Sequence, residues 1–140
     1  MRSKRIPTTR AFTDRRWSAI AAPTCAVTGG LAFAVAIAIA DGEDDFGRQA
    51  AAHVPWDRPL VAALALALVV GVPMMLSAYT LWRATPFAAV TAVIAGGLLI
   101  TWIAVQIVAG AFHPLQILFG LVGVFVMATG WHIASGQARV

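Results

Sequence analysis

The stretch Leu60–Trp82, LVAALALALVVGVPMMLSAYTLW, runs for more than 20 residues without one charged side chain. An α-helix rises about 1.5 Å per residue, so a segment of this length crosses the roughly 30 Å hydrocarbon core of a bilayer. Three further stretches share this character, at residues 18–40, 87–109 and 115–134. The sequence therefore predicts an all-α membrane protein, a four-helix bundle whose short connections make successive helices antiparallel.

The composition leaves little room for anything outside the membrane. Hydrophobic residues make up 60% of the chain and charged residues 11%, whereas soluble domains carry about 25% charged residues. We therefore expect a membrane domain at residues 18–134, preceded by a basic cytoplasmic tail at 1–17 and followed by a short cytoplasmic tail at 135–140. The net charge of +4 is concentrated in the first tail, next to a membrane helix. That placement indicates a topology signal near anionic lipid and not a nucleic-acid partner.

The distribution of Lys and Arg predicts the orientation, because basic residues collect on the cytoplasmic side of a membrane. Six lie in the N-terminal tail, while the connection between the first two stretches holds five acidic residues and two arginines. With both termini inside (N-in, C-in), eight basic residues are cytoplasmic and two are outside. Arg15, Arg16 and Arg83 flank the stretches most closely and are the predicted topology determinants. Tryptophans fall at the three predicted inner boundaries: Trp17, Trp82 and Trp131.

A secretory signal is the alternative interpretation of the N-terminus. The run Ala38-Ile39-Ala40 before Asp41 is similar to a signal-peptidase site, and basic residues precede the apolar stretch. That stretch exceeds the roughly 7–15 residues of a signal core, which favours an uncleaved membrane helix. Cleavage after Ala40 would leave three helices.

Small residues at four-residue spacing predict where the helices touch, because association in lipid relies on close contact. The predicted packing positions are Gly30, Gly71, Gly96 and Gly120. The first belongs to the series Ala26, Gly30, Ala34 and Ala38. Pro73, in the middle of the second stretch, lacks a backbone N–H, so we expect a kink there. Whether that kink has a function stays open at this level.

No pattern of catalytic, metal or cofactor residues emerges. Cys25 is the only cysteine, which excludes an intramolecular disulfide and a CxxC redox pair. The acidic segment that begins at Asp41 has Phe46 and Ala52 where a calcium-binding EF-hand requires Gly and Glu. Weak divalent binding remains the alternative there. The three histidines, at positions 53, 113 and 132, do not share a depth inside the bundle, as a pair of haem ligands must.

The interiors of the apolar stretches also contain no ionisable group of the kind that marks ion and proton pathways, since His132 lies at the inner end of the fourth. Small multidrug antiporters have a similar length but depend on a carboxylate in the first helix, so the similarity ends at size. The most distinctive polar groups are Gln106, near the outer end of the third stretch, and Gln116, at the start of the fourth. Trp102 lies one turn before Gln106 on the same face. The two amides are predicted to hydrogen-bond each other, or this face is a lipid or partner contact.

The second half of the chain resembles a set of uncharacterised small four-helix membrane proteins common in high-GC Gram-positive (actinobacterial) bacteria. The resemblance covers roughly residues 55–131. It rests on the spacing of Pro59-Leu60, Gly71-Val72-Pro73, Leu81-Trp82-Arg83, Trp102-Ile103-Ala104-Val105-Gln106 and His113-Pro114-Leu115-Gln116. It implies four helices in a bacterial inner membrane and implies no activity. The long basic N-terminal tail departs from the pattern.

Two hypotheses for function follow. The first is a non-catalytic, multi-pass protein of the bacterial plasma membrane. It would act as an accessory or scaffold subunit that contacts the lipid bilayer and other membrane proteins, or its own copies. The alternative is a small transporter or lipid-handling component, similar to a flippase, that acts as an oligomer. An enzyme needs clustered acid, base or metal groups, which the apolar stretches do not supply, so we expect no catalysis.

Overall fold

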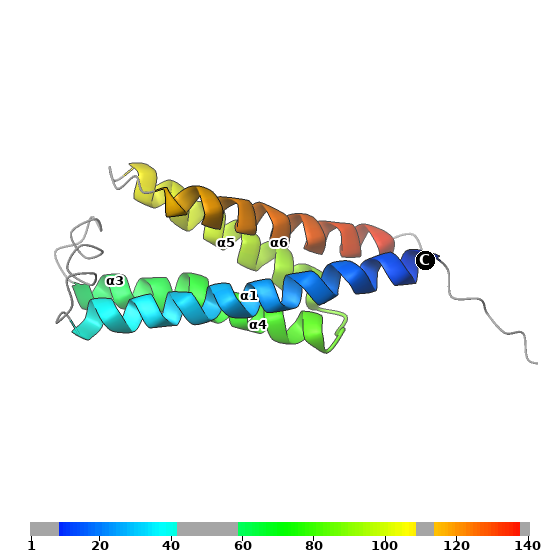
Figure 1. The fold of residues 1–140 in the computed structure, drawn as a ribbon, viewed down its shortest axis with the longest axis horizontal. Coiled ribbons are helices and arrows are strands. Elements are labelled where there is room, and N and C mark those ends of the chain that lie inside the picture. The colour runs from blue at the N-terminus through cyan, green and yellow to red at the C-terminus, as the bar shows by residue number, and fades with distance from the viewer. Residues whose placement is uncertain (1–8, 42–58, 109–113, 138–140) are drawn as a thin grey trace, which may run out of the picture.

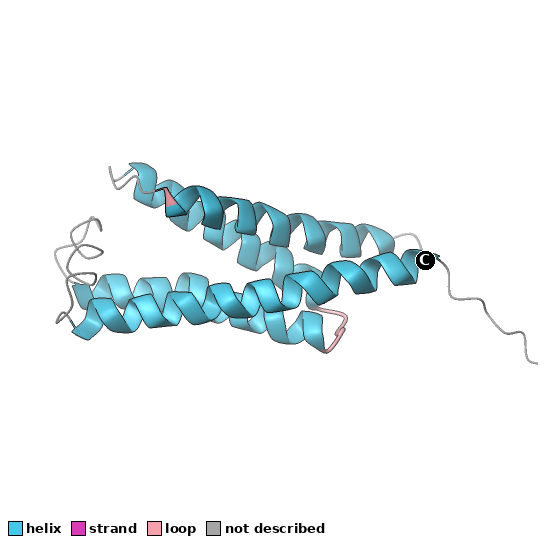
Figure 2. Ribbon diagram, viewed as in Figure 1, coloured by secondary structure: helices cyan, strands magenta, loops and turns pink. Residues whose placement is uncertain are grey.

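The computed structural model describes residues 9–41, 59–108 and 114–137, and these residues are helical apart from the turn at 83–87 and Pro114. The elements are α1 (Thr9–Asp41), α3 (Pro59–Leu66), the π-helix η1 (Ala67–Gly71), α4 (Val72–Trp82), α5 (Ala88–Val108) and α6 (Leu115–Gln137). The segment from α3 through η1 to α4 is one uninterrupted helical run (Figure 2). The described part of the chain is thus all-helical, as the sequence predicts.

Four helices of the described chain are long and apolar enough to cross a membrane: Arg15–Asp41, Leu60–Trp82, Ala88–Val108 and Leu115–Gly136. They confirm the four long apolar helices expected from the sequence. The first helix begins earlier than the predicted span, at Thr9, so Arg15 and Arg16 lie on α1 and not in a separate tail. Hydropathy marks only the part of a helix that suits hydrocarbon, whereas the backbone hydrogen bonds continue into polar sequence. The acidic segment, His53, Trp56, His113 and Arg139 lie outside the described residues.

The helices form two pairs, one made by α1 with α3–η1–α4 and the other by α5 with α6. The ribbons of the two pairs lie close together where α1 starts and α6 ends, and diverge toward the end where α3 and α6 start (Figure 1). Contacts between α1 and α6, and between α4 and α5, join the pairs. At the close end, the Trp17 ring centroid is 5.9 Å from that of Phe125 and 6.5 Å from that of His132.

The turn between the pairs is fixed by backbone geometry and by two hydroxyls. Ala84 has a positive φ of 49°, and the N–H of Thr85 donates to the carbonyl of Thr80 at 3.0 Å. This is the usual way in which a left-handed residue ends a helix. The hydroxyls of Thr80 and Thr91 are 2.6 Å apart and tie α4 to α5 beside the turn. The sequence therefore reverses direction there with its polar groups satisfied.

Glycines make the contact between α5 and α6. A Cβ added at Gly96 would lie 2.6 Å from the carbonyl oxygen of Gly123 and 2.7 Å from the backbone nitrogen of Met127. A Cβ at Gly130 would lie 2.7 Å from the carbonyl oxygen of Ala89. The two backbones therefore touch directly, which only glycine permits.

The other predicted packing glycines behave differently from one another. A Cβ at Gly71 would lie 3.1 Å from the ring of Phe33 on α1, so this position is a close contact. Gly30 and Gly120 would meet no atom within 4 Å, so they do not pack within the chain as expected. On α1 the close position is Gly29, whose added Cβ would lie 2.9 Å from Cγ of Met75. Successive residues of an α-helix point about 100° apart. Small residues at four-residue spacing therefore predict that a helix packs closely, but not which of two adjacent faces makes the contact.

The disturbance expected at Pro73 takes the form of the π-helix η1, which ends just before it. The N–H of Val72 donates to the carbonyl of Ala67, five residues earlier, and α4 continues from there with Pro73 in its first turn. A π-turn widens the helix by one residue and often occurs at functional sites. The wide turn accommodates the proline without breaking the helical run.

Gly96 and Gly97 give a matched test of the α5–α6 contact. Gly96→Ala should lower the free energy of unfolding by about 1–3 kcal/mol, because the new methyl overlaps backbone atoms of α6. Gly97→Ala adds the same methyl where no atom lies within 4 Å, and should leave stability unchanged or raise it by up to about 1 kcal/mol. Thermal unfolding in detergent measures both, and equal effects would contradict the contact.

Candidate functional site

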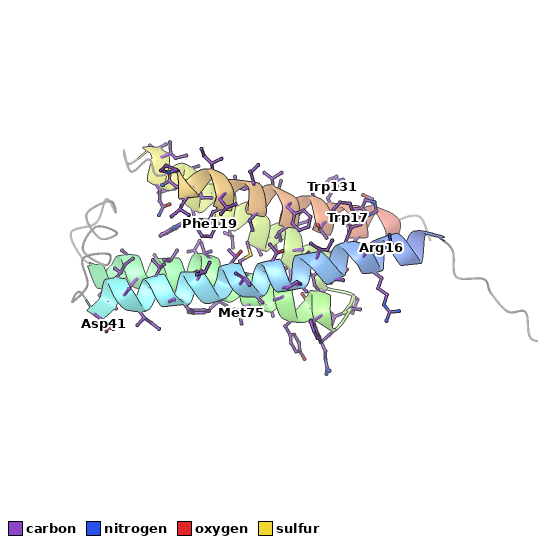
Figure 3. All side chains as sticks on the ribbon, viewed as in Figure 1. Arg16, Trp17, Asp41, Met75, Phe119 and Trp131 are labelled. Atoms are coloured by element: carbon purple, nitrogen blue, oxygen red, sulfur yellow. The ribbon has the colours of Figure 1, made fainter. Side chains whose placement is uncertain are left out.

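A cavity of about 150 Å³ lies between the two helix pairs. Its wall combines residues from α1, α3, η1, α5 and α6, so it depends on the way in which the pairs meet. The lining residues are Thr28, Leu31, Ala32, Val35, Leu66, Val70, Leu99, Trp102, Ile103, Gln106, Gln116 and Phe119. Phe119 extends from α6 toward the space between the pairs, in the half of the molecule opposite Arg16 and Trp17 (Figure 3).

The polar end of the cavity is formed by two amides. Nε2 of Gln116 donates to Oε1 of Gln106 at 3.4 Å, which is the hydrogen bond that we expected from the sequence. Gln106 lies two residues before the end of α5, and Gln116 is the second residue of α6. The pair therefore lies close to the helix ends, at the end of the bundle where α1 also finishes. Gln116 is only 9% exposed, so the amide pair forms part of the wall.

Trp102 lies one helical turn before Gln106 and lines the same cavity. It is partly buried and packs against the main hydrophobic core. The distance from Trp102 to the end of α5 is six residues, or about 9 Å. Its indole N–H is enclosed without a hydrogen-bond acceptor among the described residues. The ring therefore contributes apolar surface to the cavity.

The rest of the wall is almost entirely aliphatic. Leu99 and Ile103 contribute from α5 on either side of Trp102 in the chain, and Ala32 contributes from α1. Val70 contributes from η1, so the π-helical turn forms part of the wall. The cavity is thus graded, with amides at the helix ends and hydrocarbon side chains toward the middle of the bundle. Such a surface can bind an elongated amphiphile through hydrogen bonds and van der Waals contact.

The basic residues predicted to set the topology lie away from the cavity. Arg15 and Arg16 are exposed near the start of α1, at the opposite end of the bundle. Arg83 follows α4, where its guanidinium carbon lies 5.8 Å from the centroid of the Tyr79 ring. Among the described residues, no group of three or more His, Cys, Asp or Glu side chains is placed to hold a metal ion.

The α5–α6 wall of the cavity is predictable from the sequence, whereas the α1–η1 wall is not. The α5–α6 wall is visible as three distinctive residues joined by a short connection. The α1–η1 wall consists of ordinary residues such as Ala32 and Val70, which nothing in the sequence marks. Only the packing of one helix pair against the other brings them to the cavity.

Comparison of the chain with known protein families, curated proteins and solved structures finds no match. The class defined by the described residues is that of a multi-pass membrane protein with four candidate membrane-spanning helices. The resemblance to small actinobacterial membrane proteins stays a prediction.

The amide pair can be tested with a double-mutant cycle. Gln106→Leu and Gln116→Leu should each reduce the free energy of unfolding, and the double variant should lose less than the sum. The expected coupling is about 0.6 kcal/mol, the average for side-chain hydrogen bonds inside a membrane bundle. Thermal or denaturant unfolding in detergent provides the measurement. Strictly additive losses would show that the two amides do not interact.

Proposed function

We propose that this chain is a non-catalytic, multi-pass protein of the bacterial plasma membrane that serves as an accessory or scaffold subunit of a membrane assembly. In this proposal the chain forms an antiparallel four-helix bundle with both termini in the cytoplasm. The pairing of Gly96 with Gly123, and of Gly130 with Ala89, supports antiparallel neighbours, because positions rise along one helix as they fall along the other. The excess of Lys and Arg near the termini supports the orientation.

The observation that carries the proposal is the outward-facing small-residue surface of α1. Ala26, Gly30 and Ala34 are exposed, one turn apart, and an added Cβ at Gly30 meets nothing within 4 Å. Within the chain, α1 instead packs through the adjacent face that contains Gly29. In lipid, small residues allow a second helix to approach closely. This surface therefore suits a helix of another membrane protein or of a second copy.

The chemistry of the cavity also suits binding and not catalysis. Its polar side chains are amides, a threonine and an indole, which form hydrogen bonds but do not ionise in the range where acid–base catalysis operates. Cys25 and Ser77, which are fully buried, belong to the hydrophobic core and do not line the cavity.

Co-purification tests the accessory role. The full-length protein, extracted from its native membrane in mild detergent, should retain a stable heteromeric partner. Gly30→Leu should abolish that association without lowering the thermal stability of the chain itself, because the new side chain projects outward. Ala104→Leu, an equal enlargement on an exposed position of α5, should retain the partner. A partner that is retained equally by both variants would contradict a role for this face of α1.

Reporter fusions test the orientation. A reporter active only in the periplasm, placed after Val140, should be silent, and the same reporter within the segment 41–57 should be active. Replacing Arg15 and Arg16 by Glu should weaken this asymmetry more than replacing Arg48 and Arg58, because the first pair flanks a membrane helix on its predicted inner side. Periplasmic activity at the C-terminus would contradict the N-in, C-in arrangement.

The cavity favours a second candidate, a small transporter or lipid-handling component that acts as an oligomer. It lies between two helix pairs whose ribbons diverge toward one end (Figure 1), and the π-helical turn forms part of its wall. Purification of a homo-oligomer without any other protein would support this candidate over the accessory subunit.

A further inference from the structure

We propose that the cavity between the helix pairs holds a segment of one acyl chain of a membrane phospholipid. The ester region of that lipid lies beside Gln106 and Gln116, and its hydrocarbon tail lies against the aliphatic wall. The inference rests on the proposed membrane-spanning arrangement and names a ligand for the cavity. It does not depend on the accessory role, since no other protein takes part.

The size of the cavity separates an acyl chain from a partner helix. An α-helix with its side chains is about 10–12 Å across, which a cavity of about 150 Å³ cannot contain. A single acyl chain is narrow and flexible, so it can follow an irregular space between helices. The small side chain of Ala32 on α1 makes room for it in the wall.

The order of polar and apolar groups along the cavity matches the order of groups in a lipid. Gln106 and Gln116 lie within about 3 Å of the ends of their helices, where the ester groups of a bilayer are found. Leu99 lies nine residues, or about 14 Å, from the end of α5, which is close to half of the roughly 30 Å hydrocarbon thickness. The cavity therefore reaches from the helix ends toward the middle of the bundle, with both amides at its polar end and a hydroxyl, that of Thr28, farther in.

The relative affinity of water and lipid for such a cavity also favours an acyl chain. Water gains too few hydrogen bonds to fill a largely aliphatic cavity, and such cavities stay dry or take up apolar molecules. In a membrane the apolar molecules at hand are lipid chains. The amide pair adds specificity, because Nε2 of Gln106 can donate to an ester carbonyl while Oε1 of the same side chain accepts from Gln116.

Trp102 provides a reporter inside the cavity wall. In a variant with Trp17, Trp56, Trp82 and Trp131 replaced by Phe, it is the only tryptophan. The purified variant is reconstituted into phosphatidylglycerol vesicles in which a fraction of the lipid carries bromine on an acyl chain, because bromine quenches indole fluorescence on contact. We expect strong quenching of Trp102. If brominated lipid leaves the fluorescence of Trp102 unchanged, no acyl chain enters the cavity.

Two substitutions distinguish a bound chain from the surrounding bilayer. Ala32→Leu fills the cavity from α1 and should reduce the quenching of Trp102 at least twofold. Ala104→Leu adds the same atoms to an exposed position of α5 and should leave the quenching unchanged. If both variants are quenched like the parent, Trp102 senses only bulk lipid and the proposal is wrong. Should Ala32→Leu fail to fold, Val35→Phe fills the cavity from a half-buried position and carries the same expectation.

Native mass spectrometry of the unmodified chain, released from the same vesicles without bromine, identifies the ligand. One retained phospholipid per protein chain, reduced at least twofold in Ala32→Leu and not in Ala104→Leu, is the expected result. A free fatty acid in place of the phospholipid, or a protein that retains no lipid, would overturn the proposal. These measurements use one purified protein, so their failure is separate from the loss of a partner in Gly30→Leu.

Discussion

The direct backbone contact between α5 and α6 is the constraint on which the rest of the structure depends. Gly96, Gly123 and Gly130 let the two helices touch along much of their length, because no side chain separates them. Lipid offers no hydrophobic force to hold helices together, so close van der Waals contact has to supply the association. The α5–α6 pair is therefore a rigid unit, and the amides of Gln106 and Gln116 meet at its end because the short connection brings α6 back beside α5.

The second helix pair joins this unit unevenly. Near the start of α1 the buried side chains are small, including Ala21, Ala22 and Cys25, and the pairs pack closely. Farther along, the same helix presents Thr28, Leu31 and Val35 to a cavity. A separate small cluster of Ala36, Ile39 and Ala63 holds α1 to α3 at the far end. The molecule is thus well packed in one half and hollow between the pairs in the other.

The sequence predicts the elements of this structure better than their relative rotation. Charge-free stretches long enough to cross a bilayer fix the four helices, and Gln106 and Gln116 are predictable as a pair because few residues separate their helices. Gly30 and Gly29 show the limit. Both belong to a helix rich in small residues, and only the neighbouring helix decides which one is covered. The start of α1 at Thr9 is also not predictable from hydropathy, because the backbone helix begins before the apolar stretch does.

The π-helical turn has a consequence for the phase of the second membrane helix. Ala62 and Met74 are both buried, at 1% and 0% exposure, although twelve residues separate them. An uninterrupted α-helix turns by about 100° per residue, so these two side chains would point about 120° apart. The extra residue accommodated in Ala67–Gly71 removes about 100° of that difference and returns Met74 to nearly the same side as Ala62. One inserted residue therefore works as a phase correction that keeps the buried face of this helical run on nearly the same side before and after the π-helical turn.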